Sequence, residues 1–68
     1  MNDIADWSAN LRSARRRRGL TQADLAEAAG ISPQLISLIE GGYLSSTRTR
    51  EAISAALSCP PAELFPVA

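Results

Sequence analysis

Arginine is the residue type in this chain best suited to chemistry, and that chemistry is the binding of anions. The 68 residues contain seven arginines and no lysine, and five of the arginines lie between Arg12 and Arg18. The seven carboxylates are scattered along the chain, so the formal net charge is zero. We expect Arg16 and Arg17 to contact phosphate groups, although part of the cluster also suits the negative end of a helix.

The other reactive side chains argue against catalysis. The chain has no histidine, and its single cysteine, Cys59, has no partner base to activate it, so we interpret it as a small buried apolar residue. Clusters with metal-binding spacing and glycine-rich phosphate loops are also missing. The sequence therefore predicts a protein that is not an enzyme and uses no metal, no cofactor and no small-molecule ligand.

The cysteine content and the hydropathy of the sequence indicate in which cellular compartment the protein is found. A single cysteine suits a reducing cytosol, where thiols stay free. No apolar run approaches the ~20 residues that a membrane-spanning helix needs. We expect a cytoplasmic protein with no membrane partner.

The elements that hold the arginines in place follow from helix start and stop signals. Apolar residues recur at spacings of three and four before Gly19, which predicts a first helix that ends there. Thr21, followed three residues later by Asp24, predicts the capped start of a second helix. Gly30 ends that helix after about nine residues.

Similar signals set the rest of the chain. Ser32 followed by Pro33 predicts the start of a third helix, which runs to Glu40 and is closed by two glycines. A fourth helix begins at residue 46 or 47, and Pro60 precedes a last short turn. No stretch alternates apolar and polar residues over the length of a strand. The predicted fold class is all-α, a compact five-helix unit, with residues 1–68 forming a single domain.

The second and third helices are the most informative pair. Their connection is so short that they must cross steeply, which requires a small residue at the contact, Ala26, and a residue able to take positive φ at the bend, Gly30. A short helix held outward on a rigid neighbour has the shape that enters a DNA major groove. The third helix leaves four residues on its outer face: Pro33, Gln34, Ser37 and Leu38.

The run LRSARRRRGLTQADLAEAAGISPQLISLIEGG resembles the helix-turn-helix of phage repressors and Cro proteins, the lambda-repressor-like or XRE type. The resemblance covers residues 7–65. It implies a lambda-repressor-like DNA-binding domain that binds double-stranded DNA at a palindromic operator as a homodimer. The residues that carry it include Leu11, Arg15, Gly19, Leu20, Thr21, Gln22, Leu25, Ala26, Gly30, Ile31, Ser32, Ile36, Ser37, Ile39, Glu40, Gly42, Ile53, Ala56, Leu57 and the closing Glu63-Leu64-Phe65.

The resemblance assigns base reading to the outer face of the third helix. Gln34 would read a base edge, and glutamine pairs well with adenine N6 and N7. Leu38, one turn further on beside Ser37, would pack on a thymine methyl group. The expected base-reading residues are Pro33, Gln34, Ser37 and Leu38.

The resemblance also implies phosphate contacts and one structural ion pair. Gln22 would bond a phosphate and brace the third helix, and the helix N-termini at Thr21 and Ser32 suit phosphate oxygens. Arg15 and Glu40 match a partly buried salt bridge that stabilises the fold. The full set of expected phosphate contacts is Arg16, Arg17, Thr21, Gln22, Ser32 and Tyr43.

In this family the region around the last helix commonly forms the two-fold contact. We expect dimerisation through Leu44, Leu64, Phe65 and Val67, with half-sites about one helical turn (~34 Å) apart. Because the sequence ends three residues after Phe65, no room is left for an effector domain. We therefore expect a stand-alone regulator, either a Cro-like phage or prophage repressor or a controller.

Two departures from the family keep an alternative open. The third helix carries no lysine or arginine, and the loop after it, GGYLSS, is not basic. With zero net charge and leucines such as Leu35 and Leu38 pointing outward, the chain also suits an antitoxin-like protein-interaction module that retains the fold.

Overall fold

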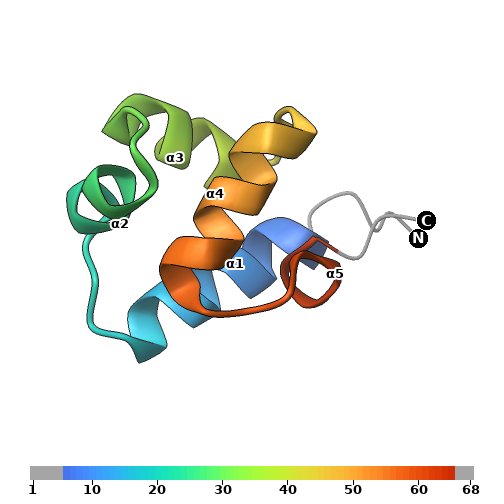
Figure 1. Ribbon diagram of the computed structural model, residues 1–68, viewed down its shortest axis with the longest axis horizontal. Coiled ribbons are helices and arrows are strands. Elements are labelled where there is room, and N and C mark those ends of the chain that lie inside the picture. Colours follow the sequence, from blue (N-terminus) through green and yellow to red (C-terminus); the bar gives the residue numbers. More distant parts are fainter. Residues whose placement is uncertain (1–5, 66–68) are drawn as a thin grey trace.

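Five helices make up residues 6–65, the part of the chain that the structure describes (Figure 1). This computed structural model describes side chains from Ser8 onward, and no β-strand occurs between residues 6 and 65. None of the helices found there has both the length and the apolar character that a membrane crossing requires. The predicted all-α class is confirmed, with the elements α1 (Asp6–Arg17), α2 (Gln22–Ala29), α3 (Pro33–Glu40), α4 (Thr47–Leu57) and α5 (Pro61–Leu64).

Three of the helices begin at capping residues. The Thr21 hydroxyl accepts a hydrogen bond from the Asp24 amide at 3.0 Å, and the Asp24 carboxylate accepts one from the Thr21 amide at 3.0 Å. Ser32 and Ser46 each accept a hydrogen bond from the amide three residues on, at 3.1 and 3.3 Å. Each cap satisfies an N–H group that the helix itself leaves without a partner, so the starts of α2, α3 and α4 are fixed locally.

The bend between α2 and α3 depends on Gly30. This residue adopts φ +74°, in the left-handed region that L side chains rarely enter. The Ile31 amide donates to the Ala26 carbonyl at 2.9 Å, and the Gly30 amide donates to the Glu27 carbonyl at 3.2 Å. These bonds close α2 and turn the chain at once into α3, which packs directly on α2 next to the buried Ala26.

One hydrophobic core lies between the five helices. In Figure 1, α3 is at the top of the molecule and α1 runs along the lower side, and α4 packs mainly against α2 and α5. Each helix contributes to this core, and in α1, α3 and α4 the buried apolar residues are three or four positions apart, so that one face of each helix points inward. The buried residues are Leu11, Ala14, Leu25, Ala26, Ile36, Ile39, Ile53, Leu57, Leu64 and Phe65.

The positions of Leu64 and Phe65, the last two of these residues, differ from the sequence-based expectation. Leu64 and Phe65 were expected at a dimer surface, but they are only 2% and 4% exposed. Their side chains complete the core where α5 packs against α1 and α4, so they do not offer a surface to a second copy. Of the other residues expected there, Leu44 is 51% exposed, and Val67 lies outside the described residues.

The geometry at Gly30 predicts the effect of adding a side chain. No atom lies within 4 Å of an added Cβ, so the cost of Gly30→Ala is backbone strain alone. We expect a loss of about 1–2 kcal/mol in the free energy of unfolding, measured by urea denaturation. Gly30→Asn is the matched variant, because asparagine tolerates the left-handed region, and it should lose less. Equal losses in the two variants would contradict this explanation.

Candidate nucleic-acid interface

The helix α3 has two distinct faces. Ile36 and Ile39 are fully buried against the core, and Glu40 at the end of the helix is 4% exposed. The opposite face is open to solvent, and Leu38 there is 58% exposed. This face holds all four expected base-reading residues, Pro33, Gln34, Ser37 and Leu38.

Leu35 does not share that face. It is half-buried and packs against the core, whereas Leu38 is exposed. The outward leucine pair that favoured a protein-binding module is thus reduced to a single leucine on α3. Two other large apolar residues, Tyr43 and Leu44, are exposed in the loop after α3, at 54% and 51%.

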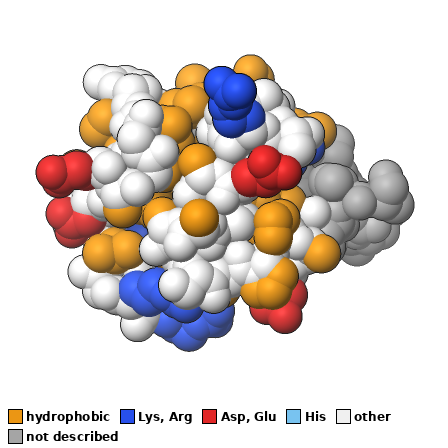
Figure 2. Space-filling model, in the orientation of Figure 1, with side chains coloured by type: hydrophobic (Ala, Val, Ile, Leu, Met, Phe, Trp, Pro, Cys, Tyr) orange, Lys and Arg blue, Asp and Glu red, His pale blue; other side chains and the backbone are white. Residues whose placement is uncertain are grey.

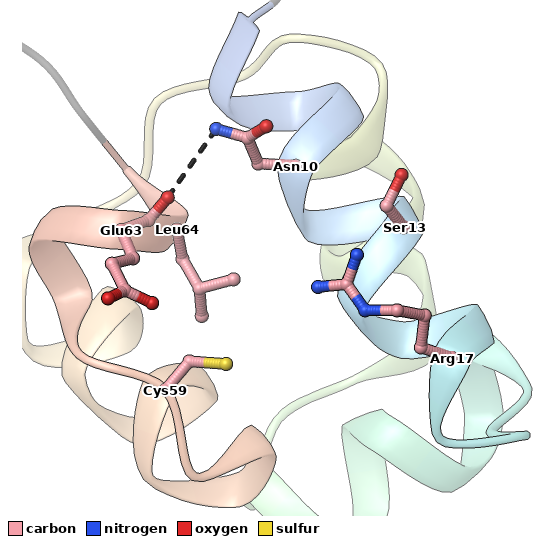
Figure 3. A pocket seen from close by; sticks show the side chains of 6 residues that line it. All are labelled: Asn10, Ser13, Arg17, Cys59, Glu63 and Leu64. Carbon is pink, nitrogen blue, oxygen red and sulfur yellow. Dashed lines mark hydrogen bonds between the residues drawn. The ribbon is translucent and has the colours of Figure 1, made fainter.

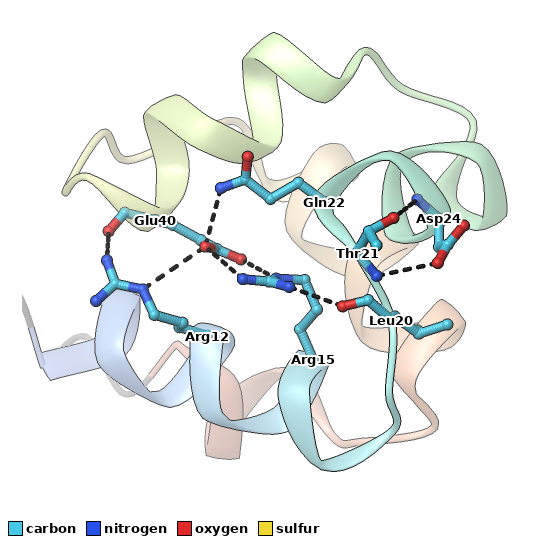
Figure 4. A network of polar contacts seen from close by, with 7 residues as sticks. All are labelled: Arg12, Arg15, Leu20, Thr21, Gln22, Asp24 and Glu40. Carbon is cyan, nitrogen blue, oxygen red and sulfur yellow. Dashed lines mark hydrogen bonds and ion pairs between the residues drawn. The ribbon is translucent and has the colours of Figure 1, made fainter.

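The buried carboxylate of Glu40 holds α3 in place. Arg15 on α1 donates to it twice, from Nε to Oε2 at 2.6 Å and from Nη2 to Oε1 at 3.2 Å. The Gln22 amide on α2 donates to Oε1 at 3.1 Å. Figure 4 shows these side chains converging from three helices on one carboxylate. A two-point guanidinium–carboxylate contact fixes orientation as well as distance, so α3 cannot rotate freely on α1 and α2.

Arg12 and Leu20 extend the same network. The Arg12 guanidinium donates to the Glu40 main-chain carbonyl at 2.9 Å and lies 3.7 Å from its carboxylate. The third nitrogen of Arg15 donates to the Leu20 carbonyl at 2.7 Å, which ties the α1–α2 loop to the same centre (Figure 4). Sequence reasoning missed the role of Arg12, although its position one turn before Arg15 was a usable signal.

The pKa of the Glu40 carboxyl reports the balance of these forces. Burial by itself raises that pKa, because it disfavours the charged form. Hydrogen bonds from Arg15 and Gln22, and the charges of Arg15 and Arg12, outweigh burial and hold the pKa below the usual range of a glutamate. The carboxylate is therefore ionised under ordinary conditions and keeps both arginines in place.

The N-terminus of α2 offers less to a phosphate than the sequence suggested. The Thr21 hydroxyl already accepts a hydrogen bond from the Asp24 amide, and the Gln22 side-chain amide already donates one to the Glu40 carboxylate. The bond from the Thr21 amide lowers the pKa of the Asp24 carboxyl, so a negative charge lies at this helix start. That charge repels an approaching phosphate, and contacts here depend on the remaining N–H and O–H donors.

The exposed arginines point in different directions. Arg17 is two residues beyond Arg15, about 200° further round the helix, so it faces away from α3. It lines a cavity between α1 and α5, where Figure 3 shows its guanidinium directed toward Cys59 and Leu64. Arg16 and Arg18 are also exposed at the end of α1. In Figure 2 the larger group of basic side chains lies at the lower edge, near that end of α1 and on the opposite side of the view from α3.

Two further arginines lie near the start of α4. Arg50 donates to the Ser45 carbonyl and, at 3.1 Å, to the Thr47 hydroxyl, so it stabilises the α3–α4 loop. Arg48 is exposed in the first turn of α4. Within the described part of the chain, no group forms a hydrogen bond with the buried Ser45 hydroxyl.

A helix-turn-helix family model matches residues 11–64, which is most of the chain. This chain belongs to the XRE-type, lambda-repressor-like helix-turn-helix family. It is a DNA-binding helix-turn-helix regulator, and α2 and α3 form the motif. No curated protein matches the chain.

The Glu40 network of this helix-turn-helix regulator predicts the effect of breaking it. Glu40→Ala leaves Arg15, whose side chain is 10% exposed, without its anion. We expect a loss of about 3–5 kcal/mol in the free energy of unfolding by denaturant titration. Glu51→Ala, at an exposed carboxylate on α4, is the matched control and should change stability by less than about 0.5 kcal/mol. A small loss in Glu40→Ala would show that the carboxylate is not the anchor of α3.

The same carboxylate predicts a pH dependence. Because the Glu40 pKa is lower in the folded chain than in the unfolded chain, its stabilising effect is complete above the ordinary glutamate pKa. That effect is lost as the pH falls through the lower pKa of the folded state. The Asp24 pKa is lowered as well, so the test is the difference between the parent and Glu40→Ala. We expect this difference to shrink in thermal unfolding as the pH falls below the ordinary glutamate pKa; a constant difference would contradict the assignment.

Proposed function

We propose that this helix-turn-helix regulator binds an inverted-repeat operator as a homodimer and reads it with α3 in the major groove. The observation that supports the proposal most directly is the division of α3 into two faces. One face is anchored by Ile36, Ile39 and the Glu40 network, and the other exposes the four base-reading candidates. A rigid helix with a free polar and apolar outer face suits direct contact with base edges.

The chemistry of that face favours A·T pairs in the half-site. Gln34 lies in the first turn of α3, where a glutamine amide can pair with adenine N6 and N7. Leu38, one turn further along the same face, suits a thymine methyl group because both are apolar. Ser37 can hydrogen-bond any of the bases, and Pro33 brings the start of the helix close to the groove.

The phosphate contacts we propose are fewer than the arginine count implies. Thr21, Gln22, Ser32, Tyr43 and Arg16 remain candidates, whereas Arg17 faces the α5 side of the molecule. Arg48 joins them, because it is exposed in the first turn of α4, where a helix N-terminus favours an anion. With so few cations near α3, we expect affinity to depend only modestly on salt.

The dimer contact that we propose lies in the α3–α4 loop. Leu44 is exposed there, and the main-chain amide of the neighbouring Tyr43 donates to the Leu38 carbonyl at 3.0 Å, which holds the loop against the end of α3. A two-fold contact at this place would set the spacing of two recognition helices. A protein seated in this way blocks the operator, so we propose repression by occlusion, as in Cro-like regulators.

The second candidate is a protein-interaction module. It is favoured by the zero net charge and by three exposed large apolar residues, Leu38, Tyr43 and Leu44. Such a module would use the same surface for a protein partner. The two candidates differ in what this surface binds, which is a specific DNA sequence in the first and a protein in the second.

Selection of bound duplexes from a random pool, followed by sequencing, tests the proposal. We expect enrichment of an inverted repeat with half-site centres about one helical turn apart, ~34 Å. Leu44→Glu should reduce the fraction of dimer in sedimentation equilibrium and favour single half-sites. An unchanged dimer in this variant would rule out the loop contact, and no enrichment at all would favour the protein-interaction module.

Two substitutions separate base reading from phosphate binding. Gln34→Ala should weaken operator binding by ~1–3 kcal/mol and relax preference at one base pair per half-site. Arg16→Ala should weaken binding to all sequences alike and lower the salt slope by about one. Both are measured by fluorescence anisotropy against operator and scrambled duplexes. If Gln34→Ala keeps the parent's preference at every base pair, α3 is not the reading surface.

A further inference from the structure

A cavity of about 200 Å³ lies between α1 and α5, on the side of α1 that faces away from α3 (Figure 3). It is separate from the candidate DNA interface, and the expected function makes no use of it. At ~30 Å³ for each water in the liquid, the cavity has room for a small metabolite. Its lining residues are Asn10, Ser13, Arg17, Cys59, Glu63 and Leu64.

Two charges of opposite sign border this cavity without pairing. Among residues 8–65, neither the Arg17 guanidinium nor the Glu63 carboxylate makes a hydrogen bond or an ion pair. Arg12, Arg15 and Arg50, by contrast, are all engaged with carboxylate, carbonyl or hydroxyl oxygens. The cavity therefore offers a cation and an anion to a ligand that carries one negatively and one positively charged group.

The remaining lining groups add polar contacts and an apolar wall. Asn10 donates to the Glu63 main-chain carbonyl at 3.4 Å, which brings α1 and α5 together at the end of the cavity. The Ser13 hydroxyl lies between Asn10 and Arg17 on the same side of α1 (Figure 3). Across the cavity from Arg17 lies Cys59, which is partly buried and provides an apolar contact, while Leu64 is almost wholly buried beneath it.

We propose that this cavity binds a small free α-amino acid in its zwitterionic form. Arg17 and Ser13 bind the carboxylate, since guanidinium groups favour two-point contacts with that group. Glu63 binds the ammonium through its carboxylate and its main-chain carbonyl, and a short side chain packs on the partly buried Cys59. A simple anion would meet the charge of Glu63, and a simple cation would meet Arg17, so the zwitterion is the preferred ligand.

Binding of the amino acid in this cavity would stabilise the fold as a whole. The ligand would join α1 to α5, and α1 also carries Arg12 and Arg15, which hold α3. A ligand that binds only the folded chain stabilises it by mass action. The amino acid would thus raise the thermal stability of the protein without touching the recognition face.

The test is an NMR titration of the full 68-residue chain with glycine, L-alanine or L-serine. We expect saturable amide shifts at Asn10, Ser13, Arg17, Cys59 and Glu63. Acetate and methylammonium, which carry one charge each, are the matched ligands and should bind roughly ten-fold more weakly or worse. No saturable shift with any of the three amino acids would overturn the proposal, as would equal binding of acetate and the amino acids.

Variants at the lining charges give an independent test. Arg17→Gln and Glu63→Gln should each raise the dissociation constant by roughly ten-fold, because each removes one charged contact. The controls Arg18→Gln and Glu51→Gln change exposed charges that do not line the cavity and should leave it unaltered. Bound amino acid should also slow the alkylation of Cys59 by iodoacetamide. If the lining and control variants bind alike, or if alkylation is not slowed, the site is not in this cavity.

Discussion

The ionised carboxylate of Glu40 is the interaction on which the rest of this structure depends. It ends α3 inside the protein, where a lone charge would be strongly disfavoured. Two arginines of α1 and a glutamine of α2 donate to it, so both of these helices are tied to the end of α3. These donors together offset the cost of burying the charge, and this links the positions of α1, α2 and α3 to one another.

A second consequence concerns the way the protein can bind DNA. The arginines that hold Glu40 are no longer fully available to phosphates, and Arg17, near the end of α1, faces α5 instead of α3. The outer face of α3 is neutral, with an amide, a hydroxyl and an exposed leucine. Such a surface favours contacts with particular bases over general attraction to the backbone, which is consistent with a regulator of zero net charge.

The two sides of α1 contact different parts of the molecule. One side, with Arg12 and Arg15, fixes α3, and the other, with Asn10, Ser13 and Arg17, borders the cavity next to α5. Because a helix advances about 100° per residue, neighbouring arginines in the run from Arg15 to Arg18 reach quite different surroundings. In a chain this short, one helix can therefore contribute both to the core and to two separate surfaces.

Local signals in the sequence determined the helices and the two faces of α3. Thr21, Ser32 and Ser46 cap the helices that they precede, and Gly30 takes the positive φ that the short turn needs, because capping and φ preferences act within a few residues. Only the tertiary structure decided the rest. Leu64 and Phe65 became core and not surface, Arg12 joined Glu40, and Arg17 turned toward α5. These outcomes depend on which helix packs against which, and residues as far apart as Arg12 and Glu40 meet only after the chain has folded.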